Sequence, residues 1–171
     1  AKQQATAFAS HESHGDIAEW QGYIESMRGA ATALGSSKEL AEAAGHAAKL
    51  GGECANCHRA MTAIVTFEFI EKPDMSAKDA KAHMAMHKWG VERLWEGLVG
   101  PSDSHWALGA EALEMDPVTK SKEPKGVAEL AAQEHTIASK AKTTTDPEER
   151  AALYGELLST CSSCHSMTRN K

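Results

Sequence analysis

The sequence is poor in aromatic residues, has no long apolar run and carries no excess of basic charge. Aromatic residues make up 5% of its 171 residues, so small and aliphatic side chains must fill most of the core. No apolar stretch approaches the roughly 20 residues of a membrane-spanning helix. The formal net charge is −6 at pH 7, which argues against nucleic acid as a partner and suits a basic docking partner.

Several catalytic patterns are missing as well. No Ser-His-Asp set, glycine-rich phosphate loop or paired carboxylate site stands out, and the acidic residues are spaced as on solvated helix faces. The chain is long enough to bury a substantial core, and we expect residues 1–171 to form a single domain.

The four cysteines form two copies of one motif, Cys-x-x-Cys-His, at residues 54–58 and 161–165. This is the attachment signature of a c-type haem, in which two thiols bond the porphyrin and the histidine is the proximal iron ligand. A zinc site made of four cysteines gives no reason for the two histidines, and thioredoxin-like chemistry needs a βαβ context that is missing. The sequence therefore predicts two covalent haems, attached at Cys54, Cys57, Cys161 and Cys164, with His58 and His165 as proximal ligands.

Apolar residues recur every three or four positions through residues 15–34, 40–61 and 80–98, which predicts amphipathic helices. Cys54 and Cys57 continue the apolar stripe of the second helix, so a haem would replace part of the core there. Residues 64–70 have the β-branched and aromatic content of a strand, but no second strand is available to pair with them. We expect them to form the end of the second helix.

The second half of the chain adds further helices. Ser76 and Asp79 resemble a capping box, Ser102 can cap a shorter helix, and residues 127–140 predict another helix after a polar loop at 116–126. Asp146 and Pro147 begin the last helix. We expect an all-α fold, a four-helix-bundle core with one or two extra helices inserted before the last helix. The chain resembles two α-hairpin halves, each ending in Cys-x-x-Cys-His.

The remaining histidines include the candidates for the sixth iron ligands. Hairpin geometry places His14 and His87 at the depth of the first motif, and an up-down-up-down bundle would bring both haems to one end. His11 and His83 are the alternatives, each about one turn away. A His-x5-Trp match between residues 14–20 and 83–89 favours His83, but its register sets apolar positions 24 and 27 against charged positions 93 and 96, which favours His87. The sequence does not assign either ligand to one haem.

Other side chains are expected around the porphyrins. Trp20 and Trp95 are predicted to pack against haem faces and helices. His46, His105 and His135 are expected to lie on the surface or to bond a haem propionate, because the predicted depths favour other residues as iron ligands. Methionine at helical spacing is usually core, so Met27, Met61, Met84 and Met86 are secondary candidates for ligands.

A Cys-x-x-Cys-His motif at the end of a terminal helix, here Cys161, Cys164 and His165, in an alanine-rich bundle resembles the class II cytochromes c, the cytochrome c′ type. The resemblance covers the first three helices and the last one. It implies a haem on the C-terminal helix, and the family contains both gas binders and electron carriers. The second motif at Cys54, Cys57 and His58 and the inserted helices depart from that pattern, as in a dihaem relative.

The first reading is an electron-transfer cytochrome with two low-spin, bis-histidine haems that passes electrons between redox partner proteins. Because c-type haem is attached after export, we expect a bacterial periplasmic protein whose signal peptide was removed. One alternative is a haem enzyme or gas binder with a five-coordinate iron open to peroxide, nitric oxide or carbon monoxide. Another is a subunit or sensor module of a larger redox complex.

Overall fold

The computed structural model describes residues 18–74, 79–114 and 126–168, and all regular secondary structure in these segments is helical. This confirms the all-α prediction. None of these helices combines the length and apolar character needed to cross a membrane. The helices are α2 (Ala18–Ser36), α3 (Leu40–Ala60), α4 (Ala80–Val99), α5 (Asp103–Leu113), α6 (Val127–Thr143) and α7 (Pro147–Thr168).

Three helices begin with side-chain caps, and the caps predicted at Ser102 and Asp146 are confirmed. At α4 the N-cap is Asp79 itself, whereas the predicted capping box places Asp79 at the third helical position. The Asp79 carboxylate accepts a hydrogen bond from the Ala82 amide at 2.8 Å, and the Ser102 hydroxyl accepts one from the His105 amide at 3.4 Å. Asp146 accepts from the Glu149 amide at 2.8 Å, immediately before Pro147. These caps satisfy amides that have no partner within a helix. Ser76, predicted to share in the first of these starts, lies outside the described residues.

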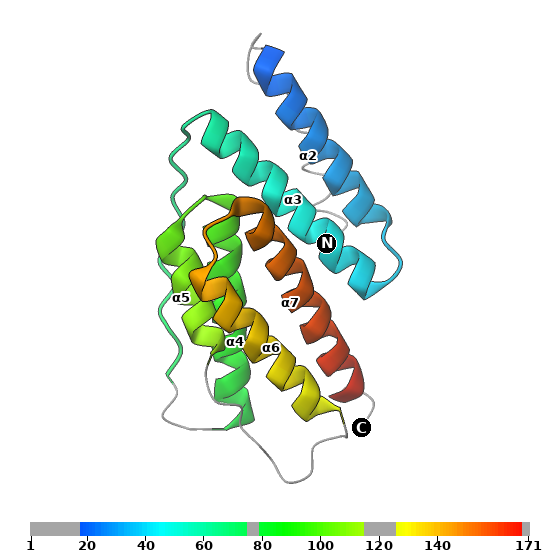
Figure 1. Cartoon of the computed structure of the whole chain (residues 1–171), viewed down its shortest axis with the longest axis vertical. Coiled ribbons are helices and arrows are strands. Elements are labelled where there is room, and N and C mark those ends of the chain that lie inside the picture. The colour runs from blue at the N-terminus through cyan, green and yellow to red at the C-terminus, as the bar shows by residue number, and fades with distance from the viewer. Residues whose placement is uncertain (1–17, 75–78, 115–125, 169–171) are drawn as a thin grey trace.

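Helices α4, α5, α6 and α7 run up, down, up and down around one core (Figure 1). Trp106 of α5 is almost completely buried there, and its indole N–H donates to the Ala141 carbonyl of α6 at 2.7 Å. Glycines let α4 and α5 approach closely, since a Cβ on Gly109 would lie 2.6 Å from the Gly90 carbonyl oxygen. The core side chains are aliphatic and aromatic residues from five helices, including Ala48, Leu94, Leu98, Leu113, Ile137, Leu153 and Leu157.

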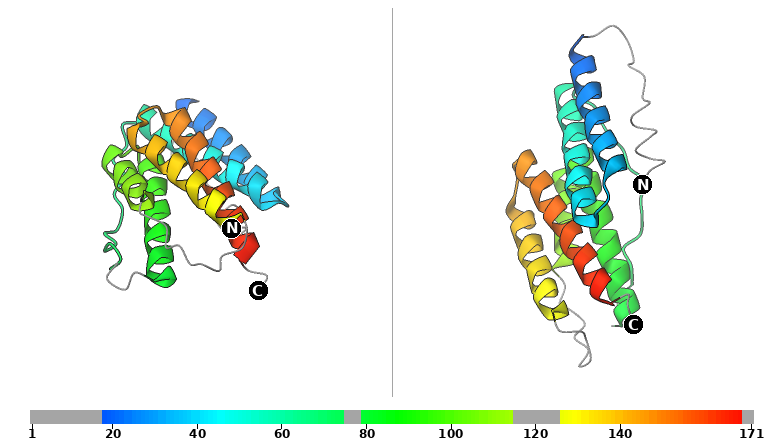
Figure 2. Two further views of the ribbon diagram at one scale, coloured as in Figure 1. Left: turned by 60° about the horizontal axis from the view of Figure 1, so that its bottom comes forward. Right: turned by 90° about the vertical axis from the view of Figure 1, so that its right-hand side faces the viewer.

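The α2–α3 hairpin packs onto this group through α3 and extends beyond it at the end away from the end of α7 (Figure 2). Among the described residues, α2 contacts α3 but no other helix. The prediction that the first three helices and the last one form the bundle is therefore wrong. The two helices predicted between the third helix and the last one are present as α5 and α6. They belong to the four-helix group, however, and α2 lies outside it.

Residues 63–74, here called the strap, are not helical, so the prediction that helix two continues to residue 70 is wrong. Helix α3 ends with the Ala63 amide bonded to the His58 carbonyl and the Thr62 amide bonded to the Arg59 carbonyl. Thr62 has a φ of 49°, the left-handed conformation that closes a helix in this pattern. The β-branched and aromatic residues that follow have poor helix propensity, which explains why the helix does not resume.

The strap runs back along α4 and α5 toward the start of α4 (Figure 1). Its Phe67 ring lies against Gly100, and its Ile70 carbonyl accepts a hydrogen bond from the Trp89 indole at 3.0 Å. Because the strap returns the chain to the opposite end, α3 and α4 both finish at the same end of the molecule. This connection decides which histidines can lie near which motif.

Candidate functional site

The two Cys-x-x-Cys-His motifs lie at opposite ends of an antiparallel helix pair. Gly155 of α7 lies against Ala48 of α3, where a Cβ on the glycine would be 3.1 Å from the alanine Cβ. Cys57 lies nine residues beyond Ala48, and Cys161 lies six residues beyond Gly155. At 1.5 Å per helical residue, roughly 20 Å separates the two cysteines along the helix axes. The expectation that both haems sit at one end is therefore wrong, because it assumed a helical connection in place of the strap.

The N-terminal motif is formed by the last turns of α3. Cys54 is buried among Ala30, Ala31 and Leu50, whereas Cys57 and His58 are half-buried. The His58 Nδ1 lies 2.7 Å from the carbonyl oxygen of Val99, the last residue of α4. If Nδ1 carries the proton and donates to this carbonyl, Nε2 presents a lone pair suited to a metal.

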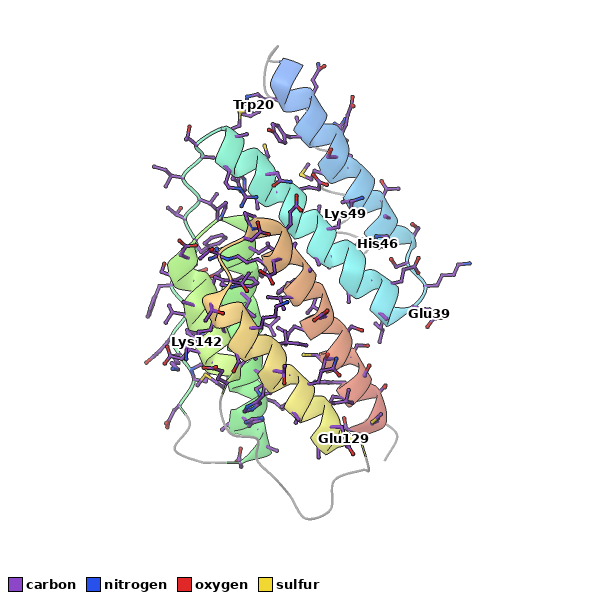
Figure 3. The ribbon with its side chains drawn as sticks, viewed as in Figure 1. Trp20, Glu39, His46, Lys49, Glu129 and Lys142 are labelled. Carbon is purple, nitrogen blue, oxygen red and sulfur yellow. The ribbon has the colours of Figure 1, made fainter. Side chains whose placement is uncertain are left out.

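The predicted tryptophans lie on either side of this motif. Trp20 is half-buried in the first turn of α2, at the end of the α2–α3 hairpin where the motif lies (Figure 3). Trp95 lies against Gly51, one turn before Cys54, and its ring centroid is 5.7 Å from that of Tyr154. Trp95 thus fills the interior between the two motifs. Whether either indole contacts a haem stays a prediction.

The C-terminal motif is formed by the last turns of α7. Cys161 and Cys164 are half-buried, and His165 is exposed. Burial raises the pKa of the Cys161 thiol to about 11, with the nearby Glu134 carboxylate as the next cause. Because Glu134 belongs to α6, this helix lies beside the motif.

Imidazoles from two further helices gather at this end. His83 and His87 lie one turn apart on α4, with ring centroids 4.2 Å apart. His87 is half-buried, and its pKa is lowered to about 4 by burial and then by the nearby imidazoles of His83, His135 and His165. His87 is therefore neutral at pH 7, the form in which an imidazole binds a metal.

Several polar atoms in this cluster are buried without a hydrogen-bond partner among the described residues. They are the Nε2 atoms of His87 and His135 and the Oε1 atom of Glu134. Burial raises the pKa of the Glu134 carboxyl to about 7. Buried polar groups in folded proteins are normally paired, so this end has the polar atoms expected around a bound group.

The sequence predicts no role for Glu134 and only a peripheral one for His135. A signal was present, because Glu134 occupies the apolar stripe of α6 that continues through Ile137, Ala138 and Ala141. A carboxylate on a buried stripe is rare unless it has a partner or a function. Its position therefore marked α6 as part of a site.

The objection to the register that favours His83 does not hold. The objection is that this register matches two apolar residues with charged ones, Ile24 with Arg93 and Met27 with Glu96. Both charged residues are in fact buried, and the Arg93 guanidinium donates to the Glu96 carboxylate at 2.6 Å. A buried ion pair can occupy positions that are apolar in the other half, because each charge neutralises the other.

Other predicted residues lie elsewhere. His14 and its alternative His11 lie outside the described residues. His46 lies on α3 well away from the cysteines of its helix and pairs with Glu42 at 3.9 Å (Figure 3). His105 bonds to Ser102 at the start of α5. Of the methionines considered as ligands, Met86 is core and Met84 is 43% exposed, while Met27 and Met61 are half-buried.

The geometry also bears on the alternatives to haem. Cysteine pairs at opposite ends cannot share one zinc ion, and no group of three or more metal-binding side chains is assembled within the described segments. Burial raises the pKa of Cys54 to about 11, as it does for Cys161. Reactive dithiols commonly have a lowered thiol pKa, so the raised pKa values of Cys54 and Cys161 do not favour that chemistry.

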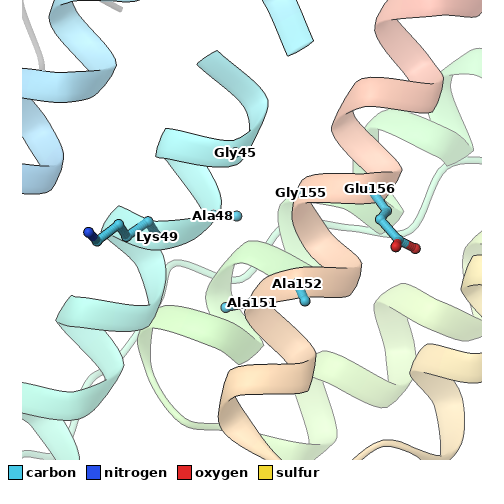
Figure 4. Close-up of a pocket in the computed structure, with 7 residues that line it drawn as sticks. All are labelled: Gly45, Ala48, Lys49, Ala151, Ala152, Gly155 and Glu156. Carbon is cyan, nitrogen blue, oxygen red and sulfur yellow. The ribbon is translucent and has the colours of Figure 1, made fainter. Parts of the chain in front are cut away.

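An open groove of about 380 Å³ lies between α3 and α7, midway between the motifs (Figure 4). Its lining consists of Gly45, Ala48, Lys49, Ala151, Ala152, Gly155 and Glu156. These mostly small residues allow the two helices to approach closely. The groove contains none of the cysteines or histidines of the candidate sites, so we assign it a packing role.

Comparison with protein-family models, with curated proteins and with solved structures gave no match, so the two motifs and their surroundings carry the functional argument.

Proposed function

We propose that the protein is a dihaem c-type cytochrome of the bacterial periplasm that passes electrons between redox partner proteins. The resemblance to class II cytochromes c belongs to this proposal, extended by a second haem and two further helices. When bound, each haem supplies a one-electron Fe(III)/Fe(II) couple.

The observation that carries the proposal is the cluster of imidazoles facing the C-terminal motif. Helices α4 and α6 bring His83, His87 and His135 toward the turn that bears Cys161 and His165. The unpaired Nε2 of His87 and Oε1 of Glu134 need a partner that the described protein atoms do not provide. A metal-bearing group attached at the cysteines fits this set, with His165 as one ligand and an α4 imidazole as the other.

We favour His83 over His87 as the second ligand. His83 is 7% exposed and is the more deeply buried of the two. The register that matches residues 83–89 with residues 14–20 is compatible with the buried Arg93–Glu96 pair. His87 then packs on His83 through the ring contact and limits the rotation of its imidazole.

At the N-terminal motif the protein holds the proximal imidazole in place. The Val99 carbonyl fixes the orientation of His58, and such an outer partner also raises the basicity of a ligand imidazole. Cys54 is packed into the α2–α3 interface, which anchors one side of the attached group. By the matching register, His14 is the residue proposed as the second ligand here.

Separation of the two sites gives each end its own docking position. With one motif at each end of the α3–α7 pair, one partner can deliver an electron while another removes one. The net charge of −6 favours basic partner surfaces through electrostatic steering.

Optical spectra of the oxidised protein, the reduced protein and the reduced protein under carbon monoxide test the function. An electron carrier with two six-coordinate irons gives low-spin bands that the gas does not shift. A high-spin component that shifts under carbon monoxide would contradict the electron-carrier assignment and support a gas binder or haem enzyme.

A further inference from the structure

The strap presents large apolar side chains to solvent. Ile64 is 93% exposed, Phe69 is 88% exposed and Ile70 is 43% exposed. Isolated apolar residues are common on surfaces, but these three lie within seven residues of one non-helical segment. The strap also runs along the margin of the molecule, to the left in Figure 1.

The backbone of this segment is unpaired. Between residues 64 and 70, the Ile70 carbonyl accepts from the Trp89 indole, and no backbone–backbone hydrogen bond joins this segment to another described one. A segment with strand-like composition and free backbone groups is a template for pairing with another strand. The described chain provides no partner strand for this segment.

Two contacts hold the second half of the segment, residues 67–70, along α4. The Phe67 ring packs against Gly100 and lies 5.6 Å from the His105 ring, between centroids. Three residues later, Ile70 is bonded to Trp89, roughly 16 Å further down α4 at 1.5 Å per residue. Only a nearly extended backbone, helped by the long Phe67 and Trp89 side chains, covers that span. Residues 67–70 are thus held in an extended course that suits pairing with another strand.

The order of residues identifies the partner. Residues 64–70 read Ile-Val-Thr-Phe-Glu-Phe-Ile, which is symmetric in polarity about Phe67. In an antiparallel pair of two identical segments centred on Phe67, Ile64 faces Ile70, Val65 faces Phe69 and Thr66 faces Glu68. Every apolar residue meets an apolar one, and no two carboxylates meet. A two-fold interface requires this self-complementarity.

We propose that the protein forms a two-fold symmetric dimer in which residues 64–70 of two copies pair as antiparallel strands. In this arrangement Phe69 packs on Val65 of the second copy, and Ile64 packs on Ile70, while Phe67 keeps its place against Gly100. Cross-strand pairs of this kind stabilise a sheet, and dimerisation removes the exposed edge. The proposal does not depend on the haems.

Two substitutions at one exposed position provide a matched test. In the proposed register, Thr66→Lys places a cation opposite Glu68 of the second copy, and Thr66→Glu places a like charge there. Each change occurs twice per dimer by symmetry. We expect the dimer dissociation constant to fall about threefold to tenfold for Thr66→Lys and to rise by a similar factor for Thr66→Glu. Both side chains lie in solvent in a monomer, so folding is unaffected.

The measurement is sedimentation equilibrium of the full holoprotein over a wide range of concentration, with Phe69→Ser as a third variant. The proposal predicts a wild-type dimer that Phe69→Ser weakens and that responds in opposite directions to the two Thr66 variants. A wild-type protein that remains monomeric at every concentration overturns it, as expected if the apolar residues face a membrane or another protein. A dimer that responds to none of the three variants also overturns it, because the interface must then lie elsewhere.

Discussion

The imidazole rings of His83 and His87 lie with their centroids 4.2 Å apart, at the end of the molecule where α7 carries Cys161 and Cys164. The chain reaches this arrangement because the strap returns it to the start of α4. Both imidazoles therefore belong with the C-terminal motif and not with the N-terminal one.

Replacing these two histidines separately should identify the sixth ligand of the C-terminal haem. We predict that His83→Ala converts one of the two haems to a high-spin form, because the iron loses an imidazole. His87→Ala should leave both haems low-spin and change only the local environment. Low-temperature electron paramagnetic resonance of the oxidised protein measures this, since the spin states of the two haems are counted separately.

His46→Ala is the control for this pair, because His46 lies on α3 and pairs with Glu42. It should leave both signals unchanged. If His87→Ala converts one haem to the high-spin form and His83→Ala does not, then His87 and not His83 is the sixth ligand. If neither variant changes a spin state, the ligand must come from another helix, and His135 would be the first candidate.

The buried carboxyl of Glu134 predicts a pH dependence of stability. Burial raises its pKa from 4.5 to about 7, so the folded protein retains a proton that the unfolded chain releases. The free energy of unfolding should therefore fall as the pH rises from about 4.5 to about 7. Glu134→Gln removes this loss. We expect the free energy of unfolding of the variant to exceed that of the wild type at pH 8 and to approach it below pH 5.

His87 acts in the opposite direction. Its pKa is lowered from 6.5 to about 4, so the unfolded chain binds a proton that the folded protein does not, and stability falls as the pH drops through this range. In Glu134→Gln the loss on acidification should be steeper than in the wild type, since the opposing carboxyl is gone. Denaturant titrations at several pH values measure both effects, and equal pH profiles for the two proteins would contradict them.

At the end of α3, the backbone conformation of Thr62 lowers the stability of the folded protein, and a substitution can relieve this strain. Thr62 adopts a left-handed φ of 49° that glycine accepts more readily than a β-branched residue. Thr62→Gly should raise the free energy of unfolding by about 0.5–1 kcal/mol, as the difference between the relieved strain and the added freedom of the unfolded chain. Thr62→Ala keeps a Cβ and should bring less gain; an equal gain in both variants would exclude the conformational cause.

Two glycines should respond to alanine in opposite ways. A Cβ on Gly97 would lie 2.7 Å from the Trp106 Cα, and the α5 backbone cannot move away without disturbing the core. Gly97→Ala should lower the free energy of unfolding by about 1–3 kcal/mol. Gly29 has no atom within 4 Å of such a Cβ, so Gly29→Ala should raise it by about 0.5–1 kcal/mol. Chemical denaturation measures both, and a similar effect at the two sites would contradict the packing account.

The sequence predicted local features better than their arrangement in space. The caps at Ser102 and Asp146 and the all-α class follow from short-range chemistry, and the structure confirms them. The position of the C-terminal motif beside α4 follows from the bundle topology. These features depend on residues within a few turns of one another or on the alternation of helix direction.

The errors in the predicted arrangement come from one connection, the strap between α3 and α4. Residues 64–70 have the composition of a strand, but the sequence offers no second strand to pair with them, so it predicts a continued helix. An extended strap has more than twice the length of a helix per residue, so it reversed the direction of α4 relative to α3. That reversal placed the motifs at opposite ends and moved His83 and His87 away from the first motif.

The central claim is that both Cys-x-x-Cys-His motifs hold a covalent haem, and the mass of the denatured holoprotein tests it most directly. The protein is produced with the machinery that attaches c-type haem and is measured intact after unfolding, so that only covalent groups remain. We predict the mass of the polypeptide plus two haem groups, and the loss of one haem in Cys57→Ser and in Cys164→Ser. A mass equal to that of the polypeptide alone, with all four thiols free to react, would contradict the account.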